Sequence, residues 1–310
     1  MSGEFAALVA LAATLPQPPP PEVGIGDDAA VLRAPEGGWT LWAADSVVAG
    51  VHADLGLTGL DDFGWKAVAV NVSDIAAMGG IPSHLLVTVA GPPDTDLDLL
   101  YRGIAAAAAE WGCIVVGGDL ANAACLVVTV AILGWLPGPP ILRSGARPGD
   151  GIWVTGPLGL SAAGLRIMKG MEKGADGPRP SVAAGLAVER HRRPRPSVAA
   201  GLAARAAGAT AMIDVSDGLA ADVGHLADAS GVGLELEHIP VGEGATEDEA
   251  LAGGEDYVLA FTAPDGAPME TAFAGLATPI RIGTCLTSDG GRRVAGRPFP
   301  TVSGWEHRWR

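Results

Sequence analysis

An apolar segment of the chain ends in the stretch Asp214-Val215-Ser216-Asp217-Gly218-Leu219, and a helical pattern over residues 220–230 follows it. The stretch places two carboxylates and a hydroxyl within four residues, and Gly218 permits a sharp turn before the helix. Ligands of open α/β sheets usually bind at the carboxyl ends of strands. The stretch therefore predicts a strand and a helix joined by a polar turn, which is either a ligand site or a helix cap.

Four further short stretches carry aspartate among small and polar residues. They are Gly24-Ile25-Gly26-Asp27-Asp28, Ala44-Asp45-Ser46, Asn71-Val72-Ser73-Asp74 and Gly117-Gly118-Asp119. Five such stretches favour several divalent cations over a single acid–base pair. Oxygen ligands in this number suit Mg²⁺ or Mn²⁺ that hold a polyphosphate.

The composition is typical of a well-packed globular protein of two domains. The 310 residues are 48% hydrophobic and 18% charged, which argues against disorder. The net charge is −15, and no Lys/Arg-rich run is long enough to follow a nucleic-acid backbone. We therefore expect neither nucleic acid nor a membrane as partner, and an anionic substrate would need bound metal to approach.

The chain lacks the usual signals for export or membrane insertion. Residues 5–15 are apolar, but Glu4 precedes them and a proline-rich link at residues 16–21 follows. The longest uncharged apolar run, residues 121–136, is shorter than the ~18 residues that cross a bilayer and predicts a strand. The three cysteines have no CxxC spacing, and we expect them to be buried and reduced in a cytoplasmic protein. They are Cys113, Cys125 and Cys285.

A helix is predicted over residues 66–78, and it is apolar nearly all round, which is typical of a buried helix. Asp74 lies within it and needs a partner, because burying an unpaired carboxylate is costly. Lys66 lies eight residues earlier, about two turns along the same face, and is one candidate partner. A bound metal ion is the other candidate.

Several familiar catalytic motifs are missing from the sequence. It has no P-loop, no His-Arg-Asp kinase loop, no Gly-x-Ser-x-Gly elbow and no His/Cys spacing for structural zinc. Gly24-Ile25-Gly26 is no dinucleotide fingerprint, because no strand precedes it and no helix follows it. Aspartates in this number suit metal ions that bind a polyphosphate. They favour phosphoryl transfer from ATP, because that reaction depends on positioning and charge neutralisation.

Taken in order, these motifs resemble the thiamine-monophosphate kinase family of the aminoimidazole ribonucleotide synthetase superfamily over nearly the whole chain. The resemblance is carried by GIGDDAA at 24–30, Asp45 with VAGVH at 48–52, KAVAVNVSDIAAMG at 66–79, GGD at 117–119, RSGARPGD at 143–150, IDVSDGL at 213–219 and AGGEDY at 252–257. It implies an α/β (α+β) fold of two domains, which we place at residues 1–140 and 141–310. The N-terminal domain would contribute strands to a β-barrel at a homodimer interface, and the C-terminal domain would be α/β.

The resemblance also implies an activity, which is the phosphorylation of thiamine monophosphate to thiamine diphosphate by direct in-line transfer from ATP. Several Mg²⁺ ions would assist, held by Asp28, Asp45, Asp74, Asp119, Asp214 and Asp217, of which Asp214 and Asp217 count as catalytic. ATP would contact Gly118, Asp119, Arg143 and Ser216. The substrate would contact His52, Glu255 and Trp305, and an indole ring beside a cationic thiazolium is favourable.

The chain departs from the family pattern in three places. Ala43 and Ala44 replace hydroxyl residues before Asp45, and Leu120 and Ala121 replace threonines after the GGD motif. Residues 178–187 recur verbatim as 194–203, a tandem duplication that we expect to form a surface loop or an extra helical turn.

Two alternatives to the kinase stay open: another ATP-dependent enzyme of the superfamily, and a Mg-nucleotide-binding protein without turnover. Selenophosphate synthetase fits less well because it needs a reactive cysteine or selenocysteine and a lysine near the N-terminus. The first cysteine here is Cys113 and the first lysine is Lys66.

Overall fold

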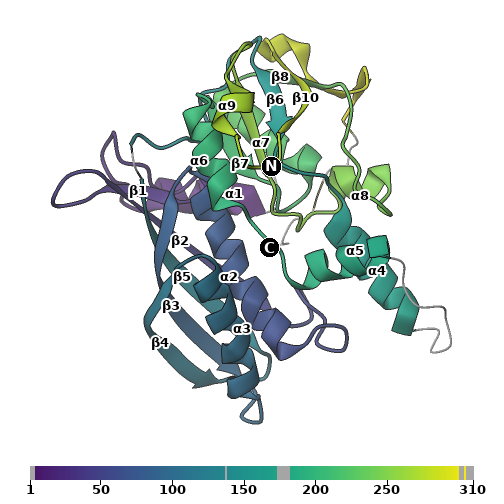
Figure 1. The fold of residues 1–310 in the computed structure, drawn as a ribbon. Helices are drawn as coiled ribbons and strands as arrows, with labels where there is room; N and C mark the ends of the chain where they lie inside the picture. The colour runs from purple at the N-terminus through teal and green to yellow at the C-terminus, as the bar shows by residue number, and fades with distance from the viewer. Residues whose placement is uncertain (1–3, 137, 173–181, 300–303, 305–310) are drawn as a thin grey trace.

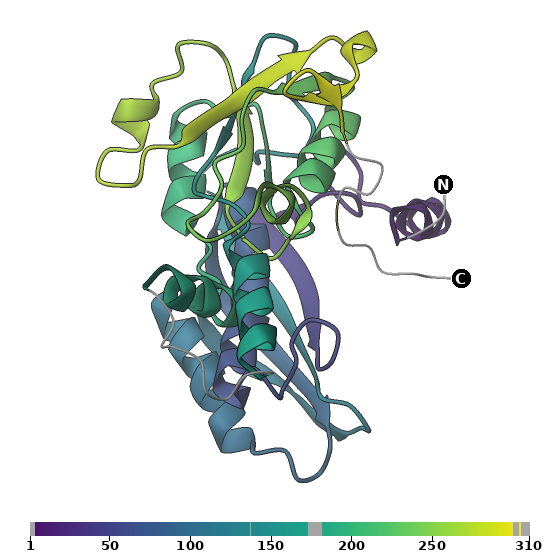
Figure 2. The same ribbon diagram turned by 90° about the vertical axis from the view of Figure 1, so that its right-hand side faces the viewer.

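The structure is a computed structural model that describes residues 4–136, 138–172, 182–299 and 304. It shows two α/β halves, one above the other in Figure 1, with helix α2 (Leu60–Ala77) in the lower half reaching up to the upper one. Helix α1 (Glu4–Thr14) projects away from both halves (Figure 2). Among the described helices, none combines the length and the apolar character that crossing a bilayer requires.

The N-terminal half is a five-stranded sheet in the order β1-β2-β5-β3-β4, antiparallel except for the β3–β4 pair. Helices α2 and α3 (Leu97–Glu110) pack together, and α2 lies on β2, β5 and β3. Strand β5 is rich in β-branched residues, which favour strands, and its residues alternate between buried and partly exposed. This alternation is typical of a sheet with one covered face. The strands are β1 (Ala30–Arg33), β2 (Trp39–Val48), β3 (Ile81–Gly91), β4 (Ile114–Asn122) and β5 (Val127–Leu136).

The strands differ from the sequence prediction in three places. Two stretches predicted as turns lie inside strands, and the apolar run predicted as a single strand belongs to two. Asp45 lies inside β2, and the GGD motif lies inside β4, where the pairing with β3 skips Val116 as in a β-bulge. The apolar run at 121–136 is divided, because β4 ends at Asn122 and β5 begins at Val127. The prediction that all three cysteines are buried is wrong for Cys125, which is exposed beside the turn between these strands.

The C-terminal half is a seven-stranded, mainly antiparallel sheet in the order β12-β11-β8-β10-β6-β9-β7. Its two faces bury separate clusters: Met212 packs with α6 and α9, whereas Ile213 packs with α7. Neither sheet is closed within the described part of the chain. The strands are β6 (Gly151–Val154), β7 (Ala211–Asp214), β8 (Gly233–Leu236), β9 (Leu259–Ala263), β10 (Ile280–Leu286), β11 (Arg292–Val294) and β12 (Arg297–Pro298). The helices are α4 (Leu160–Glu172), α5 (Val182–Arg192), α6 (Val198–Ala206), α7 (Leu219–Ser230), α8 (Glu247–Ala252), α9 (Met269–Ala272) and the 3₁₀ turn Ser288–Gly290.

In the described residues, each copy of the duplicated decapeptide supplies the first turns of a separate helix, where a surface loop or one extra helical turn was expected. The described residues 182–187 of the first copy begin α5, where Val182 is 93% exposed and nothing contacts the position of a Cβ on Gly185. The second copy begins α6, where a Cβ on Gly201 would lie 2.2 Å from the carbonyl oxygen of Ala76 in α2. The repeated glycine therefore faces solvent in α5 and packs against α2 in α6, whereas Ala187 of the first copy is buried against α4.

Candidate active site

Three carboxylates from distant parts of the chain meet where α2 reaches the C-terminal sheet. Asp28 precedes β1, Asp74 lies on α2, and Asp214 ends β7. One oxygen of each lies within 4.8 Å of the other two. Sequence reasoning predicted this convergence, and the structure brings these three residues together.

The electrostatics of the cluster are those of carboxylates that need a cation. Burial, then the charges of Asp45, Asp214 and Asp28, raises the pKa of Asp74 well above its usual range. Burial, then Asp28, raises the pKa of Asp214 to about 8. Like charges held this close resist ionising together unless a positive charge joins them. Asp45 contributes to both shifts, so its carboxylate belongs to the same field.

Asp28 offers a free ligand atom to such a cation. Its carboxylate is 1% exposed, and Oδ1 accepts a 2.6 Å hydrogen bond from Nη2 of Arg143. Its Oδ2 is buried without a hydrogen-bond partner in the described residues. An unpartnered buried oxygen on a carboxylate that lies beside two others fits an oxygen-coordinated divalent cation such as Mg²⁺.

Polar residues of α2 hold the cluster in place. The hydroxyl of Ser73 donates to Oδ2 of Asp214 at 2.5 Å, and Oδ1 of Asn71 accepts the backbone N–H of Asp45 at 2.9 Å. Sequence reasoning gave Ser73 and Asn71 no separate role. The signal was there, because they interrupt an otherwise apolar helix. Lys66 is not the partner of Asp74, since its Nζ pairs with Glu255 at 2.9 Å.

Asp222 of α7 fixes the turn that contains Asp217. Its Oδ2 accepts the backbone N–H groups of Asp217 at 3.1 Å and Gly218 at 3.0 Å, and Gly218 has φ of 126°. Burial, then the charge of Asp217, raises the pKa of Asp222 well above its usual range. The carbonyl of Ser216 accepts the N–H of Glu255 at 2.7 Å. The turn is therefore tied both to its own helix and to the loop before β9.

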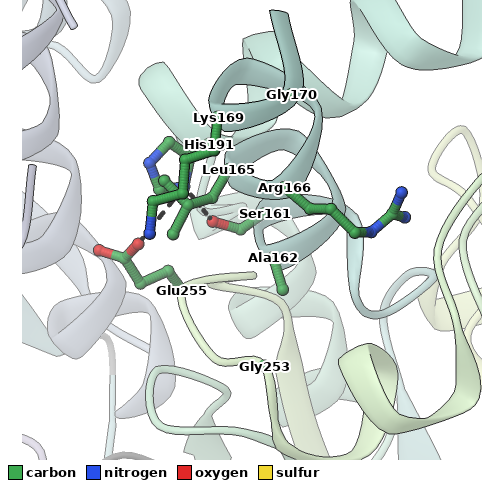
Figure 3. Close-up of a pocket in the computed structure, with 9 residues that line it drawn as sticks. All are labelled: Ser161, Ala162, Leu165, Arg166, Lys169, Gly170, His191, Gly253 and Glu255. Carbon is green, nitrogen blue, oxygen red and sulfur yellow. Dashed lines mark hydrogen bonds and ion pairs between the residues drawn. The ribbon is translucent and has the colours of Figure 1, made fainter. Parts of the chain in front are cut away.

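A cavity of about 470 Å³ lies beside this loop, between α4 and α5 (Figure 3). Glu255 borders it with φ of 58°, a backbone conformation that is uncommon outside glycine. Burial, then the charge of Lys66, lowers the pKa of His191 to about 4, so this histidine is neutral at pH 7. The lining residues are Ser161, Ala162, Leu165, Arg166, Lys169, Gly170, His191, Gly253 and Glu255.

The remaining predicted site residues lie as follows. His52 follows β2, and its backbone carbonyl accepts a hydrogen bond from Lys66 at 3.1 Å. Gly118 and Asp119 lie on the exposed strand β4, and the structure does not bring Asp119 into the Asp28–Asp74–Asp214 cluster. Trp305 falls outside the described residues.

Comparisons with known proteins agree with this geometry. The family model of the AIR synthase related protein N-terminal domain matches residues 26–136, and that of the C-terminal domain matches residues 147–285. The thiamine-monophosphate kinases of Methanopyrus kandleri and Mycobacterium tuberculosis (strain H37Rv) are 38% and 35% identical, over 90% and 98% of this chain and 88% and 91% of theirs. The solved structure of AaThiL complexed with AMPPCP and TMP has a TM-score of 0.86 and 30% identity, over 98% of this chain and 97% of its own. A solved structure of the hydrogenase maturation protein HypE in complex with ATP, at a TM-score of 0.64 and 19% identity over 89% of this chain and 87% of its own, shares the fold.

Proposed function

This chain belongs to the thiamine-monophosphate kinase family and is a phosphotransferase, and from that premise we propose that it converts thiamine monophosphate to thiamine diphosphate with ATP. The observation that carries the proposal is that the Asp28–Asp74–Asp214 cluster lies near the cavity at Glu255. The turn after Asp214 and the loop of Glu255 are joined by a backbone hydrogen bond. The cluster suits the phosphates, and the cavity suits the organic part of the substrate. A related structure holds AMPPCP and TMP together, which supports both assignments.

In the proposed mechanism, an oxygen of the substrate phosphate attacks the γ-phosphorus of ATP in line as the bond to the β–γ bridging oxygen breaks, which releases ADP. The acceptor is already anionic, so no general base is required. Mg²⁺ would neutralise the charge of the phosphates. Asp28, Asp74 and Asp214 would hold one such ion, and Asp45, Asp217 and Asp119 are proposed ligands of further Mg²⁺ ions.

Arg143 would contact the ATP phosphates, which its hydrogen bond to Asp28 at the cluster supports. Ser216, two residues after Asp214, remains a proposed ATP contact on the resemblance. Gly118 and Asp119 remain proposed ATP contacts on the resemblance. His52, Glu255 and Trp305 remain the proposed substrate contacts. We also propose domains at residues 1–140 and 141–310, supported by family models that end at 136 and resume at 147. A cytoplasmic location would keep the free cysteines reduced.

A direct assay tests the activity. Purified protein with ATP, Mg²⁺ and thiamine monophosphate should yield equal amounts of ADP and thiamine diphosphate, separated by chromatography. Replacement of the substrate by unphosphorylated thiamine should abolish ADP formation above background. ATP binding without either product would instead support a nucleotide-binding protein without turnover, the alternative that Ala43 and Ala44 suggest.

We propose that strand β4 forms the homodimer interface, where two copies would complete a β-barrel. All nine residues of β4 are exposed, and Ile114, Val116 and Leu120 are 60%, 57% and 58% exposed. An apolar edge strand of this kind is a template for pairing with another chain.

Val116→Asp should therefore convert the dimer to a monomer, because an unpaired charge would be buried in the interface. We expect the dimer dissociation constant to rise at least about a hundredfold, measured by analytical ultracentrifugation. Val182→Asp makes the same change at a 93% exposed position on α5 and should leave the dimer intact. A dimer of unchanged affinity in the Val116 variant would exclude this interface.

A further inference from the structure

Lys66 is a buried lysine with an unusual pair of partners. Its side chain is 1% exposed, and Nζ donates to Oε1 of Glu255 at 2.9 Å and to the backbone carbonyl of His52 at 3.1 Å. A buried ammonium must be paired and hydrogen-bonded, and both acceptors here belong to residues proposed to contact the substrate. One atom on α2 therefore links the two halves of the proposed substrate site.

Glu255 has a second neighbour on its other side. Nδ1 of His191 lies 3.5 Å from Oε2 of Glu255 and 3.0 Å from Oγ of Ser161, so the neutral imidazole stands between a hydroxyl and the carboxylate (Figure 3). The Glu255 side chain is 26% exposed and borders the cavity. A carboxylate held at Oε1 by Lys66, flanked by His191 and still open to a cavity is arranged to meet a ligand.

The backbone of the loop does not depend on Lys66 for its path. Glu255 and Tyr257 donate their N–H groups to the carbonyls of Ser216 at 2.7 Å and Val215 at 2.9 Å. Asp256 accepts the N–H groups of Gly159 at 2.6 Å and Ser161 at 3.2 Å. What Lys66 contributes beyond these bonds is the direction of the Glu255 side chain.

We infer that Lys66 is a positioning residue, which holds the Glu255 carboxylate toward the cavity so that it can accept hydrogen bonds from the amino-bearing ring of the substrate. This inference rests on the proposed function. It assigns to Lys66 an effect on the binding of thiamine monophosphate and none on the binding of ATP, whose proposed contacts lie at the carboxylate cluster, on the turn after Asp214 and on β4.

The test compares Lys66→Met and Lys66→Gln with Lys66→Arg and with the unaltered protein, each checked by circular dichroism. Loss of one charge-assisted hydrogen bond predicts that the neutral variants raise KM for thiamine monophosphate about tenfold or more, with KM for ATP changed less than about threefold. Lys66→Arg should recover much of the loss, because it keeps the cation. Arg193→Gln removes another cation paired with α2, through Asp61 and Asp62, and should leave both KM values unchanged.

The outcomes are distinct. Folded neutral variants with an unchanged KM for thiamine monophosphate would overturn the inference and leave the proposed function standing. Equal rises in KM for thiamine monophosphate and for ATP would also overturn the inference. Neutral variants that fail to fold, together with an arginine variant of normal KM, would overturn it as well, because the charge of Lys66 would then be needed for the fold alone. No product from the unaltered protein would overturn the proposed function and this inference together.

Discussion

Asp214→Asn should lower kcat by at least about a thousandfold while the protein stays folded. Asp214 lies at the meeting point of the cluster, 4% exposed, and contributes one of the three oxygens that would bind Mg²⁺. Asparagine has nearly the same shape and can still accept the hydrogen bond from Ser73, but it loses the negative charge that a metal ligand supplies. The measurement is thiamine diphosphate formation at saturating ATP and Mg²⁺, with circular dichroism to verify the fold.

The control for this substitution lies on the neighbouring helix. Asp228 of α7 is 69% exposed and pairs with Arg292 at the surface, so Asp228→Asn makes the same chemical change away from the cluster. We expect its kcat to stay within about twofold of the unaltered protein. Turnover by the Asp214 variant near that of the Asp228 variant would exclude a catalytic role for the cluster.

The second expected result concerns stability in a chelator. The melting temperature should fall by at least about 5 °C as the pH rises from 5 to 8. The pKa of Asp214 is raised to about 8 by burial and Asp28, and the pKa of Asp27 to about 7 by burial and the same neighbour. Between about pH 4 and pH 8 these carboxyl groups, together with Asp74 and Asp222, hold more protons in the folded protein than in the unfolded chain. His191 and His225, whose pKa burial lowers to about 4, oppose this below about pH 6.5 but are outnumbered, so stability declines as pH rises.

Magnesium should reverse this trend, because the cation replaces the protons in the cluster. We expect about 5 to 10 mM Mg²⁺, a large excess over the protein, to raise the melting temperature above its value in chelator. Calorimetry should show a larger rise at pH 8 than at pH 5. Asp214→Asn in chelator should show a flatter dependence on pH, since one titrating group is gone. A melting temperature that rises with pH in chelator would contradict the assigned direction of these pKa shifts.

Much of the framework follows from local patterns in the sequence. The buried helix α2 was predicted from its apolar residues, and the strand, turn and helix at Asp214–Leu219 from a polar stretch between two apolar segments. Local patterns failed where the strands are longer than their apolar parts, as at Asp45 in β2 and Asp119 in β4. Backbone pairing with β5 and β3 sets the ends of these strands, and that information lies far away in the chain.

The parts of the site that the sequence did not predict are long-range contacts. Lys66 and Glu255 are 189 residues apart, and Lys66 has a closer carboxylate in sequence at Asp74. His191 lies on α5, between the two copies of the duplicated segment, and no motif in that part of the sequence indicated a chemical role. Only the packing of α4, α5 and the Glu255 loop brings His191 and Glu255 to one cavity, and Lys66 reaches Glu255 from α2.

Helix α2 carries both ends of the proposed site on one rigid rod. Lys66 and Asp74 are eight residues apart, which at 1.5 Å per residue is about 12 Å along the axis. The helix therefore sets the distance between Lys66, which would position Glu255 for the ring, and Asp74, which belongs to the cluster proposed to bind the phosphates. Substrate analogues with a longer or shorter link between ring and phosphate would contact either Glu255 or the carboxylate cluster, but not both. The fixed length of the helix would therefore select substrates by length.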